Sequence, residues 1–194
     1  MKLFRFSKPF CLTLFAVLFL SACSNDPVPE EAISSTVGYG DVDVNIEVGK
    51  AAPDFSTSDA DGNTVTLSQF QPDTNVMLVF YRGNWCPFCV SHLDDIQALF
   101  PTLKENNIQL LAISPDDAEG SQKMAKKFDQ PYVFLSDTDL AITDLYGVRR
   151  DDKIPHPAVI LIDSQGDVVW YYAGEDYQQR PSSEQLKTVI SQYL

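Results

Sequence analysis

The stretch Tyr81-Arg82-Gly83-Asn84-Trp85-Cys86-Pro87-Phe88-Cys89 decides how the rest of the chain is interpreted. Before it, residues 75–81 (NVMLVFY) form a short, continuous apolar run, which is typical of a strand buried on both faces of a parallel sheet. After it, apolar residues recur every three or four positions and predict a helix from about Cys86 to Lys104. The motif is therefore expected where a buried strand ends and a helix begins.

Cys86 is expected at the first position of that helix, and this place has a chemical consequence. Free backbone N–H groups and the positive end of the helix dipole favour a thiolate over a thiol. Cys86 is therefore predicted to be an exposed nucleophile, and Cys89, one turn further, can form a disulfide with it. Pro87 suits the first turn because its missing N–H has no intrahelical partner to lose. Trp85 is expected to shield the pair.

A cysteine pair at this spacing has other interpretations. A zinc site needs two more ligands, and His92 and His156 are the only histidines in the sequence. Covalent haem attachment needs a histidine directly after Cys89, where Val90 stands. A purely structural disulfide between such near neighbours constrains the unfolded chain little. A redox-active dithiol that needs neither metal nor cofactor is favoured, with zinc binding and a structural disulfide as alternatives.

The first 22 residues have the features of a bacterial signal peptide. Three basic residues precede an apolar run over residues 10–20, which is too short for a comfortable membrane span. Leu20-Ser21-Ala22-Cys23 follows and resembles a lipobox, in which the cysteine is lipidated and becomes the first mature residue. We expect Cys23 to carry a lipid anchor; an ordinary signal peptide with a coincidental cysteine is the alternative.

Removal of residues 1–22 leaves 11 basic and 27 acidic residues, a net charge of 11 − 27 = −16. Such a charge argues against nucleic acid as a partner and against electrostatic binding to anionic lipid headgroups. Membrane contact is therefore expected through the lipid alone. In lipoproteins a serine after the lipidated cysteine favours the outer membrane, so Ser24 predicts a periplasm-facing protein if the host is Gram-negative.

Three regions are predicted along the chain: the signal peptide 1–22, a flexible polar tether over 23–47, and one globular domain over 48–194. Residues 58–63 read as a hairpin turn at the start of that domain. Further strands and helices are expected in the order β-α-β-α-β-β-α, which describes an α/β thioredoxin fold with a central mixed sheet flanked by helices. After the first helix they cover 108–114, 119–128, 131–135, 138–146, 157–163, 168–172 and 182–194.

Four segments together carry a resemblance to a known family: Ala52-Pro53-Asp54-Phe55, the motif FYRGNWCPFC, the strand PAVILID and the element Asp176-Tyr177-Gln178-Gln179-Arg180. Over residues 47–194 the chain resembles the AhpC/TSA redoxin superfamily, in its peroxiredoxin-like branch with a Trp-Cys-Pro-x-Cys site. The resemblance implies a thioredoxin-type fold. That superfamily contains both thiol peroxidases and thioredoxin-like disulfide oxidoreductases, so it leaves two activities open.

Departures from the family pattern favour disulfide exchange. Typical peroxiredoxins carry Pro-x-x-x-Thr-x-x-Cys, and neither Cys86 nor Cys89 has that threonine in register. The arginine that peroxiredoxins place before the third strand falls near Pro157, which instead resembles the cis-proline of thioredoxin-like proteins, with Pro155 as the alternative for that role. With His156 before it, this loop is expected to face Cys86 and to offer backbone groups to an extended substrate chain.

The sequence thus predicts a membrane-tethered thiol-disulfide oxidoreductase, in which Cys86 attacks a disulfide and Cys89 resolves the mixed disulfide. Its partners are expected to be protein or small-molecule disulfides and thiols, with an upstream thiol reductant that the sequence does not identify. The alternative is a thiol peroxidase acting on hydroperoxides, in which Arg82, Arg149 or Arg150 supplies a positive charge.

A non-catalytic copper-binding module is a further alternative. Redoxin-like copper chaperones space their cysteines by three residues, whereas two residues separate Cys86 from Cys89. We expect His92 to be a partly exposed surface residue rather than a ligand. Arg180 is expected to have a structural role.

Overall fold

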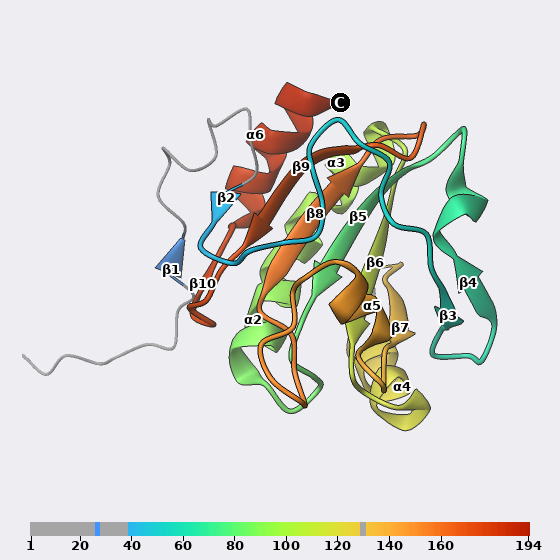
Figure 1. Cartoon of the computed structure of the whole chain (residues 1–194), viewed down its shortest axis with the longest axis vertical. Coiled ribbons are helices and arrows are strands. Elements are labelled where there is room, and N and C mark those ends of the chain that lie inside the picture. The colour runs from blue at the N-terminus through green and yellow to red at the C-terminus, as the bar shows by residue number, and fades with distance from the viewer. Residues whose placement is uncertain (1–25, 28–38, 129–130) are drawn as a thin grey trace, which may run out of the picture.

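The computed structural model describes residues 26–27, 39–128 and 131–194 (Figure 1). Its strands are β1 (Asp26–Pro27), β2 (Tyr39–Gly40), β3 (Ser56–Ser58), β4 (Thr64–Thr66), β5 (Asn75–Phe80), β6 (Ile108–Ser114), β7 (Val133–Ser136), β8 (Ala158–Ile162), β9 (Val168–Ala173) and β10 (Gln179–Arg180). Its helices are α2 (Pro87–Ile96), α3 (Phe100–Glu105), α4 (Ala118–Lys127), α5 (Ala141–Leu145) and α6 (Ser183–Tyr193), with short 3-10 helices η1 (Leu67–Phe70) and η2 (Gln97–Leu99).

A mixed sheet with the strand order β2-β9-β8-β5-β6-β7 forms the centre of the fold. β5 pairs in parallel with β6 on one side and antiparallel with β8 on the other. β8 and β9 pair antiparallel, as predicted for the returning strand. The strand that leads into the cysteine motif is therefore held by ladder hydrogen bonds along both edges, and the predicted thioredoxin-like fold is confirmed.

Both faces of β5 are covered, which explains its uninterrupted apolar sequence. Met77 and Val79 belong to a core cluster with residues of α2, α3 and α6. Leu78 and Phe80 point to the opposite face and pack in a second cluster with residues of α5. Figure 1 shows α2, α3 and α6 on one side of the sheet and α5 on the other. All four side chains are at most 1% exposed.

The predicted helix from Cys86 to Lys104 is divided into α2, η2 and α3. Pro101 lies in the first turn of α3 and has no backbone N–H. In a continuous helix that N–H would bond to the carbonyl of Gln97, and the proline ring would clash with the same carbonyl. The chain therefore passes through a 3-10 turn over Gln97–Leu99 before the regular helix resumes.

Segments before residue 48, the predicted start of the domain, also pair with it. β2 extends the sheet by pairing in parallel with β9, and β1 pairs in parallel with β10. The backbone N–H of Asn45 donates to the carbonyl of Tyr146 over 3.1 Å, and Ile46 is buried. These parts of the predicted tether therefore pair with the domain, and β2 covers part of the edge that β9 would otherwise present. The predicted signal peptide, Cys23 and Ser24 lie outside the described residues.

No helix within residues 26–27, 39–128 and 131–194 has both the length and the apolar character that a membrane span needs.

Candidate active site

The cysteine motif lies where β5 ends and α2 begins, as predicted. Cys86 is the N-cap of α2, with extended backbone angles (φ −87°, ψ 107°), and Pro87 occupies the first turn. The sulfur of Cys86 accepts a hydrogen bond from the backbone N–H of Cys89 over 3.3 Å. A sulfur in this position replaces the side-chain oxygen of an ordinary cap, so one of the free N–H groups of the helix is directed at it.

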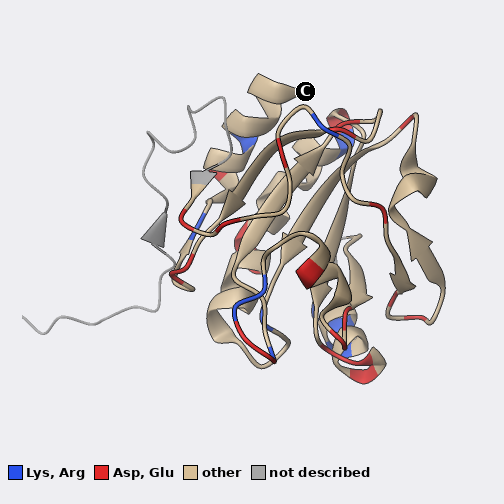
Figure 2. Cartoon of the chain, viewed as in Figure 1, with Lys and Arg blue, Asp and Glu red and all other residues tan. Residues whose placement is uncertain are grey.

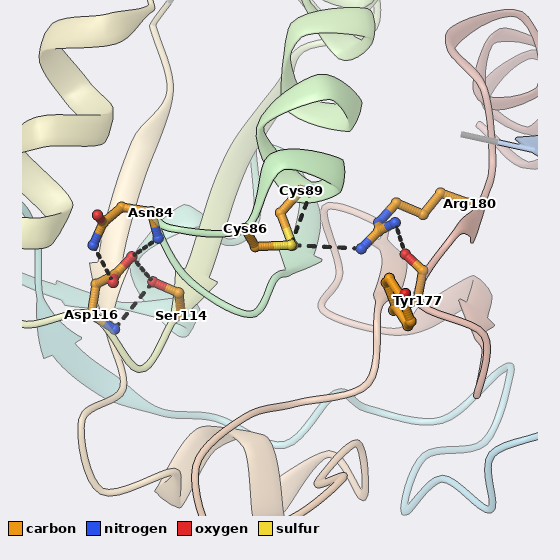
Figure 3. Close-up of a disulfide and its surroundings, with 7 residues drawn as sticks. All are labelled: Asn84, Cys86, Cys89, Ser114, Asp116, Tyr177 and Arg180. Carbon is orange, nitrogen blue, oxygen red and sulfur yellow. Dashed lines mark hydrogen bonds between the residues drawn. A yellow bond between two sulfur atoms is a disulfide. The ribbon is translucent and has the colours of Figure 1, made fainter. Parts of the chain in front are cut away.

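Cys86 and Cys89 form a disulfide with a Cα–Cα distance of 5.3 Å (Figure 3). Both cysteines are only 1% exposed, so the expectation that Cys86 is exposed is wrong for the oxidised form. The cause is packing: both side chains belong to the core cluster that also contains Tyr81 and Leu93. In the oxidised protein the two cysteines are therefore almost completely covered by neighbouring residues.

Arg180, for which only a structural role was expected, lies against the disulfide. Its Nη2 is 3.5 Å from the sulfur of Cys89, and its Nη1 donates to the carbonyl of Tyr177 (Figure 3). Burial lowers the pKa of Arg180 to about 10, and the nearby charge of Arg82 also lowers it, so the guanidinium remains charged at neutral pH. The only earlier signal was its place in the Asp176–Arg180 element of the family resemblance.

Trp85, which was expected to shield the pair, is largely exposed and lies against Arg82. Trp85 is 58% exposed, and the Arg82 guanidinium lies 5.1 Å from its ring centroid. The same guanidinium is 4.8 Å from the ring centroid of Tyr177, so it lies between two aromatic rings. Phe88 contacts the Tyr177 ring edge-on at 5.3 Å. Arg82 is therefore part of a cationic and aromatic cluster at the start of α2.

The carboxylate of Asp116, just after β6, holds the loop before Cys86 through hydrogen bonds. Asp116 accepts hydrogen bonds from the backbone N–H of Asn84 (2.8 Å), the Asn84 side chain (2.6 Å) and the Ser114 hydroxyl (2.9 Å) (Figure 3). Gly83 precedes this contact with φ of +140°, and a Cβ there would lie 2.6 Å from the Trp85 indole nitrogen. The motif needs glycine at this position because of both the backbone angle and the close approach.

The Pro157 loop differs from the expectation. Among the described residues the only cis peptide bond precedes Pro72, so the bonds before Pro155 and Pro157 are trans. The His156 N–H donates to Val148 O over 2.8 Å, and Pro157 O accepts from the Gly174 N–H over 3.1 Å. Because this backbone is already hydrogen-bonded within the domain, those groups are not free to pair with an extended substrate chain.

His92 is buried at 4% exposure, so the prediction of a partly exposed surface residue is wrong. One ring nitrogen, Nε2, lies 3.0 Å from the carbonyl of Pro181. Burial lowers the pKa of His92 to about 3, and the charge of Arg180 also lowers it. Within the described part of the chain no three His, Cys, Asp or Glu side chains are grouped as metal ligands.

The two neighbouring arginines in the loop between α5 and β8 have different surroundings. Arg149 forms a two-bond ion pair with Asp144, in which its Nη2 is 2.7 Å from a carboxylate oxygen. Arg150 is exposed and lies 5.9 Å from the Tyr177 ring centroid. Of the two, only Arg150 reaches the surroundings of the disulfide.

A dithiol or disulfide at the start of a helix, on a thioredoxin-like sheet, defines the class of thiol oxidoreductases. The chain belongs to the AhpC/TSA family, whose profile matches residues 48–171.

Two similar proteins represent the two activities found in this class. The thiol-disulfide oxidoreductase ResA of Bacillus cereus is 30% identical over 158 residues, which cover 81% of this chain and 82% of the relative. The chloroplastic peroxiredoxin Q of Triticum aestivum is 29% identical over 171 residues, 87% of this chain and 77% of the relative. The chain is therefore an enzyme that acts either as a thiol-disulfide oxidoreductase or as a peroxiredoxin.

Solved structures similar to this chain also include a peroxiredoxin and a putative protein disulfide isomerase. The reduced 2-Cys peroxiredoxin of Plasmodium vivax superposes with a TM-score of 0.65 and 26% identity, covering 75% of this chain and 94% of that one. A putative protein disulfide isomerase of Bacteroides thetaiotaomicron gives a TM-score of 0.61 and 27% identity, covering 78% and 90%. The fold alone does not separate the two activities.

Proposed function

We propose that this protein is a thiol-disulfide oxidoreductase that cycles between a Cys86–Cys89 dithiol and disulfide. The observation that carries the proposal is the disulfide itself: both cysteines lie on one turn at the start of α2, with Cα atoms 5.3 Å apart. The resolving thiol is therefore already within reach of the nucleophile in the folded domain. Cys89 can therefore attack a mixed disulfide on Cys86 from within the same helical turn.

The Cys86 thiolate attacks a substrate disulfide and forms a mixed disulfide, which expels the first substrate thiolate. The N–H of Cys89, which bonds to the Cys86 sulfur, stabilises negative charge on that sulfur. Cys89 then loses its proton and attacks the Cys86 sulfur, so the second substrate thiolate leaves. Arg180, 3.5 Å from the Cys89 sulfur, stabilises the thiolate form of Cys89 during this second step.

A thiol peroxidase is the second candidate, and one contact favours it. Arg180 places a buried positive charge at the cysteine pair, in the role that the sequence assigned to Arg82, Arg149 or Arg150. In that reaction peroxide oxidises one thiolate to a sulfenic acid, and the other cysteine condenses with it and releases water. The missing threonine hydroxyl of the peroxiredoxin pattern argues against fast peroxide reduction.

Stopped-flow measurements separate the two activities. The full chain, carrying Cys11→Ser and Cys23→Ser so that only Cys86 and Cys89 react, is reduced and mixed with hydrogen peroxide or with a disulfide while tryptophan fluorescence is followed. We expect rapid exchange with the disulfide and a peroxide rate no greater than that of a free thiol. A peroxide rate far above that of a free thiol would instead establish a peroxidase.

Single cysteine variants test the assigned roles. Cys86→Ser is expected to abolish turnover, because a serine hydroxyl at this position cannot form the thiolate that attacks the substrate. Cys89→Ser is expected to accumulate mixed disulfides, which are visible by mass spectrometry of the intact protein. A Cys86→Ser protein with full activity would refute the assignment.

We further propose that Cys23 carries a lipid and that the domain faces the periplasm from the outer membrane. The support is the Leu20-Ser21-Ala22-Cys23 motif directly after the apolar run, with Ser24 behind it. We expect the wild-type protein to partition into a detergent phase and Cys23→Ala to lose this behaviour. Equal partitioning of the two proteins would contradict lipidation at Cys23.

A further inference from the structure

Three guanidinium groups gather around Tyr177, next to the disulfide. Arg82 and Arg150 lie 4.8 Å and 5.9 Å from its ring centroid, and Arg180 donates to its carbonyl. The fold brings these residues together from three separate segments: the cysteine loop, the loop between α5 and β8, and β10. Figure 2 shows basic and acidic residues following one another in the loop between α5 and β8, at the end of the sheet where the loop before α2 also lies.

Within the described part of the chain these three arginines have no carboxylate partner. Among the described residues the ion pairs within 4.0 Å are those of Lys123, Arg149 and Lys187, so Arg82, Arg150 and Arg180 form none. The Nε of Arg82 is buried without a hydrogen-bond partner in the described chain. Arg149, directly beside Arg150, does form an ion pair with a carboxylate, so an arginine in this loop can reach one.

The absence of pairing is unexpected in this protein, because its sequence has 27 acidic and 14 basic residues. The acidic residues whose charges act on Arg180 and His156 are Asp176, Glu175 and Asp41, all of which are exposed. Neighbouring guanidinium groups repel one another: burial is the main cause of the lowered pKa of Arg180, and the charge of Arg82 lowers it further. An anion bound between them would relieve the repulsion and accept their free N–H donors.

We infer that Arg82, Arg150 and Tyr177 form a binding site for the carboxylates of a small disulfide substrate. Two further features fit this class of ligand. Trp85 is 58% exposed and offers a flat apolar surface beside the site. Each cysteine is only 1% exposed, which favours a small substrate over a large one. A compact disulfide with acidic groups close to its sulfur atoms suits both the arginine site beside Trp85 and the limited access to the cysteines. This inference rests on the proposed disulfide exchange and names its substrate class.

The reaction balances without another reactant. The reduced pair and a disulfide RSSR give the Cys86–Cys89 disulfide and two RSH: one S–S bond breaks and one forms, and the two thiol protons pass to the leaving thiolates. The carboxylates of R take no part in the chemistry. They remain on the arginine site and hold the sulfur near Cys86.

The test compares two disulfides of equal length and opposite charge, 3,3′-dithiodipropionate and cystamine. The reduced full chain, with Cys11→Ser and Cys23→Ser, is mixed with each, and each rate is divided by that of 2-mercaptoethanol with the same disulfide to remove their intrinsic difference in reactivity. We expect the normalised rate for dithiodipropionate to exceed that for cystamine roughly tenfold at low salt, because the cationic site attracts the anion. High salt is expected to reduce this preference.

Arg150→Gln and Arg149→Gln provide a matched pair of variants. Arg150→Gln is expected to reduce the preference about threefold, the effect of one exposed charge. Arg149→Gln is expected to leave it unchanged, since Asp144 already pairs with that arginine. Equal normalised rates for both disulfides, or equal effects of both variants, would overturn the inference while disulfide exchange stands. If neither disulfide reacts faster than with 2-mercaptoethanol, the proposed function itself fails.

Discussion

At the scale of single residues, Arg180 is the side chain whose environment most affects the cysteine pair. It is 2% exposed, and its Nη2 lies 3.5 Å from the Cys89 sulfur. A buried cation is costly unless hydrogen bonds or negative charge compensate it. The carbonyl of Tyr177 supplies one hydrogen bond, and a Cys89 thiolate would supply negative charge in the reduced protein. Arg180 should therefore favour the reduced state.

The reduction potential tests this role. Arg180→Gln removes a hydrogen bond to a charged group, worth about 1.5 kcal/mol, which for a two-electron couple is about 30 mV. Because the reduced thiolate loses stabilisation, the potential should become more negative. Redox titration with dithiothreitol near pH 8.5, about the ordinary pKa of a cysteine thiol, measures the shift.

Arg180→Lys is the control, because it keeps the positive charge and should restore most of the potential. Both variants must first give the same circular dichroism spectrum as the wild type, since the residue is buried. An unchanged potential in a folded Arg180→Gln protein would show that Arg180 only anchors the carbonyl of Tyr177.

At the scale of elements, the loop between β5 and α2 is positioned by a strand that follows later in the chain. Asp116, after β6, accepts two hydrogen bonds from Asn84 and one from the Ser114 hydroxyl. Asp117, the next residue, caps α4 instead by accepting from the Gly120 N–H over 2.9 Å. The two adjacent carboxylates therefore have separate tasks, one at the cysteine loop and one at a helix end.

Substitution by asparagine should distinguish these tasks. In Asp116→Asn an amide group replaces an acceptor oxygen and cannot accept all three hydrogen bonds, so we expect a loss of about 1.5 kcal/mol in unfolding free energy and slower exchange. Asp117→Asn should change the unfolding free energy by less than about 0.5 kcal/mol, since asparagine caps helices as well as aspartate does. Urea unfolding measures both. Similar losses in the two variants would mean that Asp116 has no special role in holding the loop.

At the scale of the whole molecule, His92 links the helix that carries the cysteines to the segment before α6. Its Nε2 lies 3.0 Å from the Pro181 carbonyl, and burial lowers its pKa from 6.5 to about 3. Below pH 6.5 the unfolded chain binds a proton at this residue that the folded protein does not bind. The free energy of unfolding should therefore fall as the pH decreases from about 6.5 towards 3.

The size of this effect follows from the difference in pKa. At pH 5, which is about 1.5 units below the pKa of histidine in the unfolded chain, protonation of this residue stabilises the unfolded state by roughly 2 kcal/mol. His92→Gln keeps a donor for the Pro181 carbonyl but has no group that titrates. Its loss of stability between pH 7 and pH 5, measured by urea unfolding, should be smaller than that of the wild type by this amount. Parallel pH profiles for the two proteins would contradict the assignment.

The sequence alone determined the strand, the helix start and the cysteine pair, because these depend on local patterns. An apolar run, a three-to-four residue period and a proline in a first turn are each encoded by near neighbours. The same local signals predicted the hairpin turn at residues 58–63, where Asp59 accepts hydrogen bonds from the backbone N–H groups of Asp61 and Asn63.

Only the tertiary structure decided what surrounds the pair. Arg180 is 91 residues from Cys89 in sequence, and no local period connects them. Arg149 and Arg150 are adjacent and identical in type, yet one is neutralised by Asp144 and the other faces Tyr177. Burial and charge pairing depend on which side chains the fold brings together from distant segments. Local sequence patterns therefore predict neither the burial of Arg180 nor the ion pair of Arg149.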